Sequence, residues 1–344
     1  MYHKKTGILS ACILLSFLLW GCGFSGTQNK ALDSEGSDNL ESSSSLENSS
    51  NLTEAPRQET DKTKYDNLDI TEKTLVIPGI TGDYSFLFLS DTHMITLDGT
   101  EEEQITENAL PRTGLFKDSQ GTESYESFPV WMEYANEADI ELVLLGGDII
   151  DFPSEANLKL LTENLEKLQM PYAFTLGNHD WTYPWEYMTA AGREQYRPLF
   201  APFTEENPAA HIMEMEELVI LCVDNSSNQV EAEALSVTEE ALSIGKPVNV
   251  MLHVPFSTET LIENAAALWN SPVSIGMADK GGIFPDANTL AFQEKILAGD
   301  SPVVCVLAGH VHFSDEAMLT DSVVQYVAGA GYLNEGIVLK IHGE

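Results

Sequence analysis

Short apolar runs, several of which end at carboxylate or imidazole residues, constrain the fold of this chain more than any other feature. The runs are rich in Val, Ile and Leu, and their length is typical of buried strands. They occupy residues 84–89, 142–145, 172–176, 218–223, 248–252, 303–307, 323–327 and 337–341. A chain with this pattern is expected to build its core around β-sheets.

Helical patterns separate several of these runs. The clearest has Leu158, Leu161, Leu165 and Leu168 at spacings of three and four, and Ser154 precedes it as a candidate N-cap. Strands that alternate with helices predict a layered α/β fold. Neither an internal repeat nor a second linker interrupts residues 71–344, which we therefore interpret as one domain.

Five of the apolar runs end in residues that can bind metal ions. In open α/β sheets the ligand crevice lies outside the carboxyl ends of the strands, so clusters that are distant in sequence can converge there. The clusters are Asp91-x-His93, Gly147-Asp148-x-x-Asp151, Gly177-Asn178-His179-Asp180, His253 and Gly309-His310-x-His312. Their position predicts a metal site at one edge of the sheets.

The distribution of histidine supports this prediction. The chain has 8 histidines, and apart from His3 near the N-terminus only His211 and His342 lie outside these clusters. A single histidine beside a strand is more often structural than a ligand, but five histidines with several carboxylates and an asparagine favour metal binding. In extended backbone, the pairs Asp91-x-His93 and His310-x-His312 would each place two ligands on one side of the chain.

The five clusters, in this order and spacing, resemble the calcineurin-like metallophosphoesterase superfamily. The similarity runs from about Thr74 to near the end of the chain. It implies an α/β fold, a four-layer α/β/β/α sandwich in which two mixed sheets are flanked by helices.

The resemblance also implies roles for individual residues. Catalytic roles would belong to His179, Asp148 and Asn178. His179 would protonate the leaving alkoxide; its alternative role is to support the metal ligands from behind without transferring a proton. Asp151 and Asp180 are expected behind the metal ligands, where they orient imidazoles by accepting their other N–H. The implied metal ligands are Asp91, His93 and His312 for one ion, Asn178, His253 and His310 for the other, and Asp148 as the bridge between them.

The chemistry of the ligands limits the metals. Mixed oxygen and imidazole ligands without thiolates suit two divalent ions such as Mn, Fe, Zn or Co. A pair of ions can activate a bridging hydroxide as the nucleophile and orient a phosphoryl group. We therefore expect a phosphomonoesterase or phosphodiesterase. The alternative is a lipoprotein that binds metal or phosphate without catalysis.

Charge narrows the expected partners. The sequence has 17 Lys and Arg against 54 Asp and Glu, a net charge of −37. Such a field repels polyanions, so we expect a small phosphate ester as substrate and no nucleic acid polymer as partner. The oligomeric state is not predicted by any feature of the sequence.

The N-terminal residues are typical of a secreted lipoprotein. Residues 1–21 combine a basic start with an apolar run, and Cys22 follows in a sequence that resembles a lipobox, with Trp20 as an unusual member. Residues 22–70 are rich in Ser, Asn and Glu, which predicts a disordered tether. We expect a lipid on Cys22 to hold the protein on the outer side of a bacterial membrane. An ordinary signal peptide, giving a secreted protein, or an uncleaved anchor is the alternative.

Three further features leave alternatives open. Residues 95–127 lack clear periodicity and are expected to contribute to the site. Aromatic residues beside the clusters favour packing over a wall for the substrate, and Cys222 and Cys305 favour buried free thiols over a disulfide. The aromatic residues are Trp181, Tyr183, Trp185 and Phe256.

Overall fold

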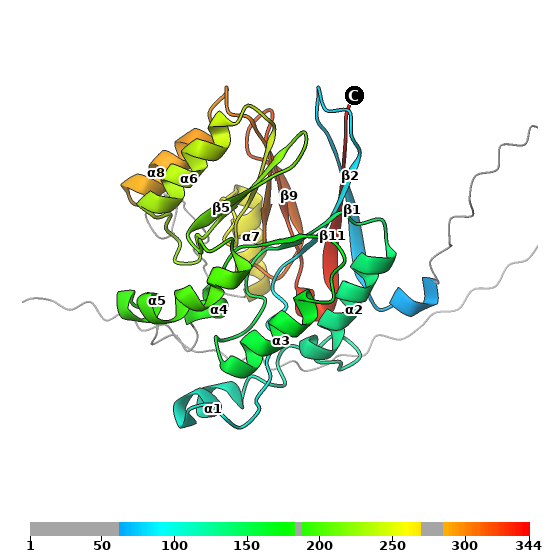
Figure 1. The fold of residues 1–344 in the computed structure, drawn as a ribbon, viewed down its shortest axis with the longest axis vertical. Coiled ribbons are helices and arrows are strands. Elements are labelled where there is room, and N and C mark those ends of the chain that lie inside the picture. The colour runs from blue at the N-terminus through cyan, green and yellow to red at the C-terminus, as the bar shows by residue number, and fades with distance from the viewer. Residues whose placement is uncertain (1–61, 183–187, 270–284) are drawn as a thin grey trace, which may run out of the picture. The chain divides into compact units, whose positions relative to one another are not determined.

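Two β-sheets face each other in the computed structural model, which describes residues 62–182, 188–269 and 285–344 (Figure 1). The first sheet has five strands, and β11 runs antiparallel to β2 whereas the other pairs are parallel. In spatial order the strands are β1 (Asp69–Val76), β11 (Glu335–His342), β2 (Tyr84–Leu89), β3 (Leu142–Leu145) and β4 (Tyr172–Phe174).

The second sheet has six strands, with parallel strands in its centre and an antiparallel strand at each edge. Its spatial order is β5 (Ala210–Glu214), β6 (Val219–Val223), β7 (Val248–Met251), β8 (Val303–Ala308), β10 (Val324–Val327) and β9 (Asp315–Met318). Both sheets are therefore mixed, as expected.

Helices cover the outer face of each sheet. Helices α2 (Ser124–Glu137) and α3 (Glu155–Leu165) pack on the first sheet, together with the 3-10 helix Arg197–Phe203. The second sheet is covered by α6 (Ala232–Ser243), α7 (Glu259–Trp269) and α8 (Ala287–Ile296). The remaining helices are α1 (Glu103–Ala109), α4 (Asn178–Thr182), α5 (Ala190–Tyr196) and the 3-10 helices Lys62–Tyr65 and Gly331–Leu333. The four-layer α/β/β/α sandwich is thus confirmed.

Alternation along the strands explains why both faces of each sheet are buried. Phe86 and Phe88 of β2 point into the core between the two sheets, whereas Leu87 and Leu89 point toward α2 and α3. Each of these side chains is fully buried, which stabilises the fold by about 1.5–3 kcal/mol per side chain before entropy is counted. Strands buried on both faces have no polar face, and for that reason they are recognisable as continuous apolar runs.

The helix predicted after Ser154 is confirmed as α3. The Ser154 hydroxyl accepts a hydrogen bond from the backbone N–H of Asn157 at 3.1 Å, so Ser154 is the N-cap. Leu168, the last residue of the predicted pattern, lies beyond the helix and packs against the same core as Leu161 and Leu165.

The folded part begins earlier than the boundary predicted at residue 71. Strand β1 begins at Asp69 and pairs in parallel with β11, and the 3-10 helix before it begins at Lys62. Tyr65 and Leu68 are buried against the core of the first sheet. The boundary was placed too late because β1 has Thr, Glu and Lys among its apolar residues, as an edge strand with one exposed side commonly does. The predicted signal peptide and most of the predicted tether lie outside the described residues.

Both cysteines of the folded part are buried free thiols, as predicted. They lie on β6 and β8, which are separated by β7, so a disulfide would have to cross a whole strand. Burial raises the pKa of the Cys222 and Cys305 thiols, which keeps both in the unreactive protonated form.

Candidate metal centre

The five predicted clusters meet at one edge of the two sheets. They follow the carboxyl ends of β2, β3 and β4 in the first sheet and of β7 and β8 in the second. Six of the seven predicted ligands form two groups of three, and within each group the ligand atoms lie within 4.8 Å of one another. The groups are Asp91, His93 and His312, called cluster A below, and Asp148, His253 and His310, called cluster B.

Backbone strain is concentrated at these residues. Asp91, His93, Asp148, His310 and His312 have φ values of 56°, 45°, 52°, 74° and 61°, in the left-handed region that side chains other than glycine rarely adopt. The prediction that the Asp-x-His and His-x-His pairs lie on extended backbone is therefore wrong. The pairs converge because tight turns redirect each ligand, a strain that proteins retain mainly at functional sites.

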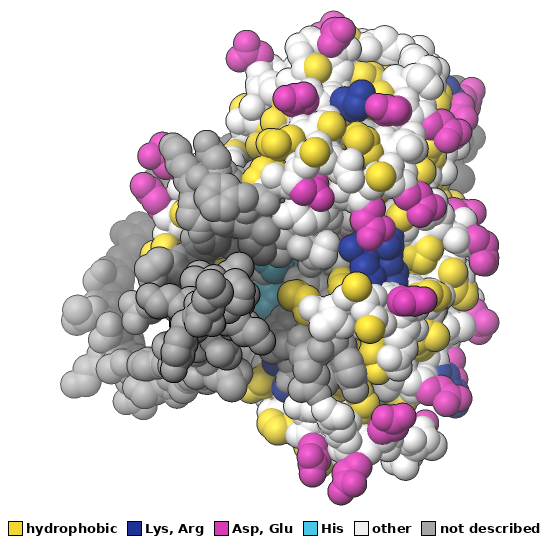
Figure 2. All heavy atoms as spheres, turned by 90° about the vertical axis from the view of Figure 1, so that its left-hand side faces the viewer, with side chains coloured by type: hydrophobic (Ala, Val, Ile, Leu, Met, Phe, Trp, Pro, Cys, Tyr) yellow, Lys and Arg dark blue, Asp and Glu magenta, His cyan; other side chains and the backbone are white. Residues whose placement is uncertain are grey.

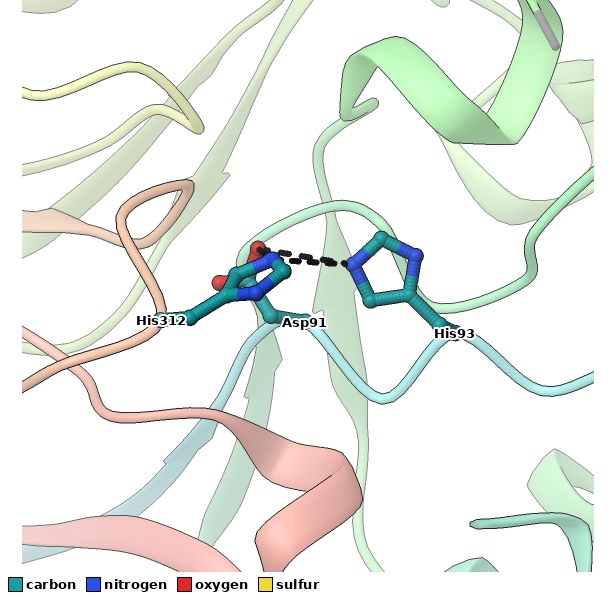
Figure 3. A group of neighbouring side chains, drawn as sticks. All are labelled: Asp91, His93 and His312. Atoms are coloured by element: carbon teal, nitrogen blue, oxygen red, sulfur yellow. Dashed lines mark hydrogen bonds and ion pairs between the residues drawn. The ribbon is translucent and has the colours of Figure 1, made fainter. Parts of the chain in front are cut away.

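Cluster A joins the first and last loops of the site. The Asp91 Oδ1 atom lies 3.4 Å from His312 Nε2 and 3.9 Å from His93 Nε2, and the two Nε2 atoms are 3.1 Å apart. Figure 3 shows the two imidazole rings and the carboxylate directed toward one point. Asp91 and His93 are buried, whereas the side chain of His312 is 27% exposed, so this cluster opens to solvent through His312.

Cluster B is built from both sheets. Asp148 Oδ2 lies 3.2 Å from His253 Nε2, and His253 Nε2 lies 3.2 Å from His310 Nδ1. The other ring nitrogen of His253 lies 2.9 Å from the carbonyl oxygen of Gly146, to which its N–H donates. That hydrogen bond leaves Nε2 as the ligand atom.

Asp148 lies between the two clusters. Its Oδ2 atom is 3.2 Å from His253 of cluster B and 3.7 Å from His93 of cluster A. A carboxylate that bridges two ions must lie close to the ligands of both, and Asp148 does. The predicted pairing of ligands with two separate metal positions, and of Asp148 with both, is compatible with this arrangement.

The residues present fit two divalent metal ions. Two ligands on one ion at the usual 2.0–2.1 Å and tetrahedral angles would lie about 3.3 Å apart, and the nitrogen pairs of clusters A and B are 3.1 and 3.2 Å apart. Asp91 Oδ1 is buried and lacks a hydrogen-bond partner among the described residues, which is costly unless a cation satisfies it.

The electrostatics of the clusters also favour cations. Burial lowers the pKa of His93 to about 4 and that of His310 to about 3, which keeps both imidazoles neutral and able to coordinate. Although burial opposes it, the Asp148 carboxylate raises the pKa of His253 to about 9. Despite burial, the nearby His312 and His253 lower the pKa of Asp91 to about 2.

Asp151 contacts two imidazoles at once. Its Oδ1 atom lies 3.0 Å from Nδ1 of His93 and 2.9 Å from Nδ1 of His179. An ionised carboxylate accepts hydrogen bonds, so it favours the tautomers in which both rings carry a proton on Nδ1. This places Asp151 where the sequence predicted an orienting carboxylate, and it leaves Nε2 of His93 as the atom directed at cluster A.

Within the part of the chain that the structure describes, the Asp180 carboxylate has no hydrogen bond to an imidazole, in contrast to the prediction. Its carboxylate instead accepts four backbone N–H groups, from Gly177, Asp148, Ile149 and Ile150, at 2.7–3.0 Å. Burial and the neighbouring Asp148 raise the pKa of Asp180 to about 8, and the N–H donors oppose this rise. Asp180 therefore fixes the turn that carries Asp148.

Asn178, the seventh predicted ligand, begins helix α4 directly beside Asp148. The backbone N–H of His179 donates to Asp148 Oδ1 at 2.7 Å. Gly177 allows this approach, since a Cβ at this position would overlap both the backbone nitrogen and the carboxylate of Asp148. The side chains of Asn178 and His179 are both buried.

Three residues that the sequence did not single out also contact the site. The ring of Phe116 stacks on His93, with centroids 4.3 Å apart and planes 4° from parallel. Tyr332 meets His312 edge-on at 5.5 Å. Arg112 donates two hydrogen bonds to Asp151, at 2.5 and 2.7 Å. Phe116 and Arg112 belong to the long stretch 95–127, which therefore contributes to the site as predicted; Tyr332 had no recognisable signal.

The predicted packing role of two neighbouring aromatic residues is confirmed. Trp181 is buried and its indole N–H donates to Ser226 Oγ at 2.7 Å. Phe256 is buried and stacks on Phe292 of α8, with centroids 6.2 Å apart. Tyr183 and Trp185 lie outside the described residues.

The fold and the site define a class of protein. Two adjacent clusters of oxygen and nitrogen ligands, at the carboxyl ends of strands in an α/β/β/α sandwich, are typical of hydrolases that use a pair of metal ions. The family model of calcineurin-like phosphoesterases matches residues 84–314. The chain belongs to this family and is a metal-dependent phosphoric ester hydrolase that uses two divalent ions.

Solved structures with a similar fold include phosphatases. The chain is similar to a dimetal phosphatase from Danio rerio, with 12% identity over 72% of this chain and 87% of that chain and a TM-score of 0.45. It is also similar to a purple acid phosphatase from yellow lupin (Lupinus luteus) seeds, with 14% identity over 74% of this chain and 45% of that chain and a TM-score of 0.48. No curated protein matches the chain by sequence.

Proposed function

We propose that this protein hydrolyses small phosphate esters, as a phosphomonoesterase or phosphodiesterase, outside the cytoplasm. The position of Asp148 carries the proposal for the site, because one of its oxygen atoms lies within 3.7 Å of ligand nitrogens from both clusters. In this proposal each cluster holds one divalent ion, with Asn178 completing cluster B. Such a pair of ions supplies Lewis acidity toward a phosphoryl group and a water molecule of lowered pKa.

The protein residues supply orientation and a proton. His179 would donate a proton to the leaving alkoxide, and Asp151 would hold its ring by accepting the Nδ1 hydrogen bond at 2.9 Å. The donating atom of His179 would then be Nε2. Cluster A lies next to this ring, since the centroids of His93 and His179 are 4.6 Å apart. A leaving group bound across the clusters is therefore within reach of His179.

The surface charge favours a small substrate. The net charge of the chain is −37, and Figure 2 shows acidic side chains around much of the periphery of the face on which histidine side chains are visible. A substrate with many phosphate groups would be repelled before it reached the clusters, whereas a small ester with one phosphate group meets little long-range repulsion.

A metal-reconstitution assay tests the proposed activity. The purified protein is stripped of metal, reloaded in turn with Mn, Zn, Fe and Co, and assayed on p-nitrophenyl phosphate and bis-p-nitrophenyl phosphate. We expect hydrolysis that depends on added metal and saturates at two ions per chain, and the ratio of the two rates distinguishes a monoesterase from a diesterase. Absence of metal-dependent turnover on both esters and on a nucleotide panel would instead support a binding protein.

The proposed location rests on residues 1–22, which lie outside the described part of the chain. Among the described residues, no helix has the length and apolar character needed to cross a membrane. The proposed anchor is a lipid on Cys22. Cell fractionation tests the anchor. The protein should partition with membranes, and Cys22→Ser should release it; equal partitioning of both forms would exclude lipidation of this residue.

A further inference from the structure

Arg112 pairs with Asp151, the carboxylate that contacts both His93 and His179. Its Nε donates to Asp151 Oδ2 at 2.5 Å and its Nη2 donates to Asp151 Oδ1 at 2.7 Å, a bidentate pair. Nη2 also lies 3.5 Å from Nδ1 of His179. The carboxylate of Asp151 is fully buried and the side chain of Arg112 is 18% exposed, so solvent screens this pair only weakly.

The segment that carries Arg112 is held in place by its own apolar cluster. Ala109 and Ile95 are buried with Phe152 in this cluster, and Phe116 packs against it. The guanidinium of Arg112 lies over the ring of Phe116, with 5.0 Å between the guanidinium carbon and the ring centroid. Phe116 in turn stacks on His93. Arg112 is therefore anchored from one side by Phe116 and from the other by Asp151.

Asp151 Oδ1 accepts from three donors, and Arg112 fixes the orientation of the carboxylate toward the other two. The atom accepts from His93 at 3.0 Å, from His179 at 2.9 Å and from Arg112 at 2.7 Å. Because a bidentate guanidinium fixes the plane of a carboxylate, rotation of Asp151 about its χ2 angle would break both bonds to Arg112. With the plane fixed, a single oxygen stays between the two Nδ1 atoms.

The charge of Arg112 has a second consequence. Asp151, His93 and His179 form a third group of potential metal ligands within 4.8 Å of one another. A cation bound by this group would have to compete with a guanidinium that already compensates the carboxylate.

We propose that Arg112 is a positioning residue, which locks the carboxylate of Asp151 so that it orients His93 toward cluster A and His179 toward the leaving group. The inference rests on the proposed roles of these two histidines. It adds a residue from the segment between β2 and α2, outside the five sequence clusters, to the machinery of the site.

Arg112→Ala and Arg112→Lys test the proposal, with Arg193→Ala as the matched control. The side chain of Arg193 is also 18% exposed and also pairs with a fully buried aspartate, Asp224, at 3.1 Å. For an alkyl phosphate we expect kcat to fall about 10–100-fold in Arg112→Ala, the usual effect of losing an outer-shell partner. Arg112→Lys should recover only part of this loss, because an ammonium group cannot form the bidentate pair, and Arg193→Ala should change kcat less than about 3-fold.

Two readouts separate positioning from a merely structural role. Millimolar guanidinium should restore kcat of Arg112→Ala but not change Arg193→Ala. In the metal-free protein with 15N-labelled histidine, the Nδ1 protons of His93 and His179 should exchange with water at least about 10-fold faster in Arg112→Ala than in the wild type, since a mobile carboxylate protects them less. This second measurement does not depend on turnover, so it tests the geometry even if the proposed activity is wrong.

Three outcomes for the Arg112 variants would overturn the proposal. An effect confined to KM would show that Arg112 binds substrate directly. Equal effects of Arg112→Ala and Arg193→Ala on kcat and on the melting temperature would show that Arg112 only stabilises the fold. If Arg112→Ala does not fold, Arg112→Lys serves as the test. Wild-type kcat and wild-type exchange of the imidazole protons in that variant would exclude the positioning role.

Discussion

Asp148→Asn should reduce kcat/KM for p-nitrophenyl phosphate by roughly 10³-fold and lower the bound metal from two ions per chain to one or fewer. Asparagine keeps the shape of the side chain but removes the negative charge that lies 3.2 Å from His253 and 3.7 Å from His93. Its amide nitrogen carries two hydrogens and has no lone pair to offer a metal ion. Kinetics and elemental analysis of the purified variant measure both effects.

Asp224→Asn is the matched control for this variant. Asp224 is as buried as Asp148 and is also paired with cationic side chains, Arg193 and Arg197, each with an atom 3.1 Å away. The control should lose stability because two partly buried guanidinium groups keep Glu231 but lose Asp224 as a partner, but it should retain both ions. If Asp148→Asn kept two ions and remained within about 10-fold of wild-type activity, Asp148 would not be the bridge.

His179→Ala should slow the hydrolysis of an alkyl phosphate by about 10²–10⁴-fold and that of p-nitrophenyl phosphate much less. An alkoxide is a poor leaving group that needs a proton as it departs, whereas nitrophenolate leaves without one. Steady-state kinetics on a series of esters with leaving groups of increasing pKa measure this difference. The variant should give a steeper dependence of the rate on the leaving-group pKa than the wild type.

His211→Ala controls for the loss of a buried imidazole. His211 on β5 is 6% exposed, close to the 9% of His179, and it belongs to neither metal cluster. We expect this variant to be less stable but to keep the wild-type dependence on the leaving group. An equal loss of rate on alkyl and nitrophenyl esters in His179→Ala would exclude a proton-donating role and leave that of a support for the site.

The central strands were predictable because they are buried, and the metal ligands were predictable because they follow these strands directly. Residues 86–89 and 142–145 are buried on both faces, which makes them continuous apolar runs, and each run is followed by a turn that carries candidate metal ligands. Strands β1, β5 and β9 lie at sheet edges and carry polar residues on an exposed side. Their periodicity is too weak to distinguish them from loops, so the sequence did not reveal them.

The detailed contacts of the site were less predictable. The Gly-Asn-His-Asp sequence predicts a ligand-bearing turn, but whether Asp180 accepts from an imidazole or from the backbone depends on how the loop after β3 folds around it. Arg112 is a single arginine in a stretch without periodicity, and its partner Asp151 is 39 residues away in the sequence. No local pattern links two such residues.

The sequence by itself determined the class of fold, the two-metal chemistry and the identity of the candidate ligands, because ligand type and order along the chain are local properties. The resemblance to a family also implied which ligands share an ion and that Asp148 lies between the two ions. The tertiary structure decided how the loops bring these ligands together and that Asp151 is fixed by Arg112. These relations depend on the packing of two sheets that bring residues 91 and 312 to within 3.4 Å. They also depend on five left-handed turns whose strain is compensated only when the surrounding core is complete.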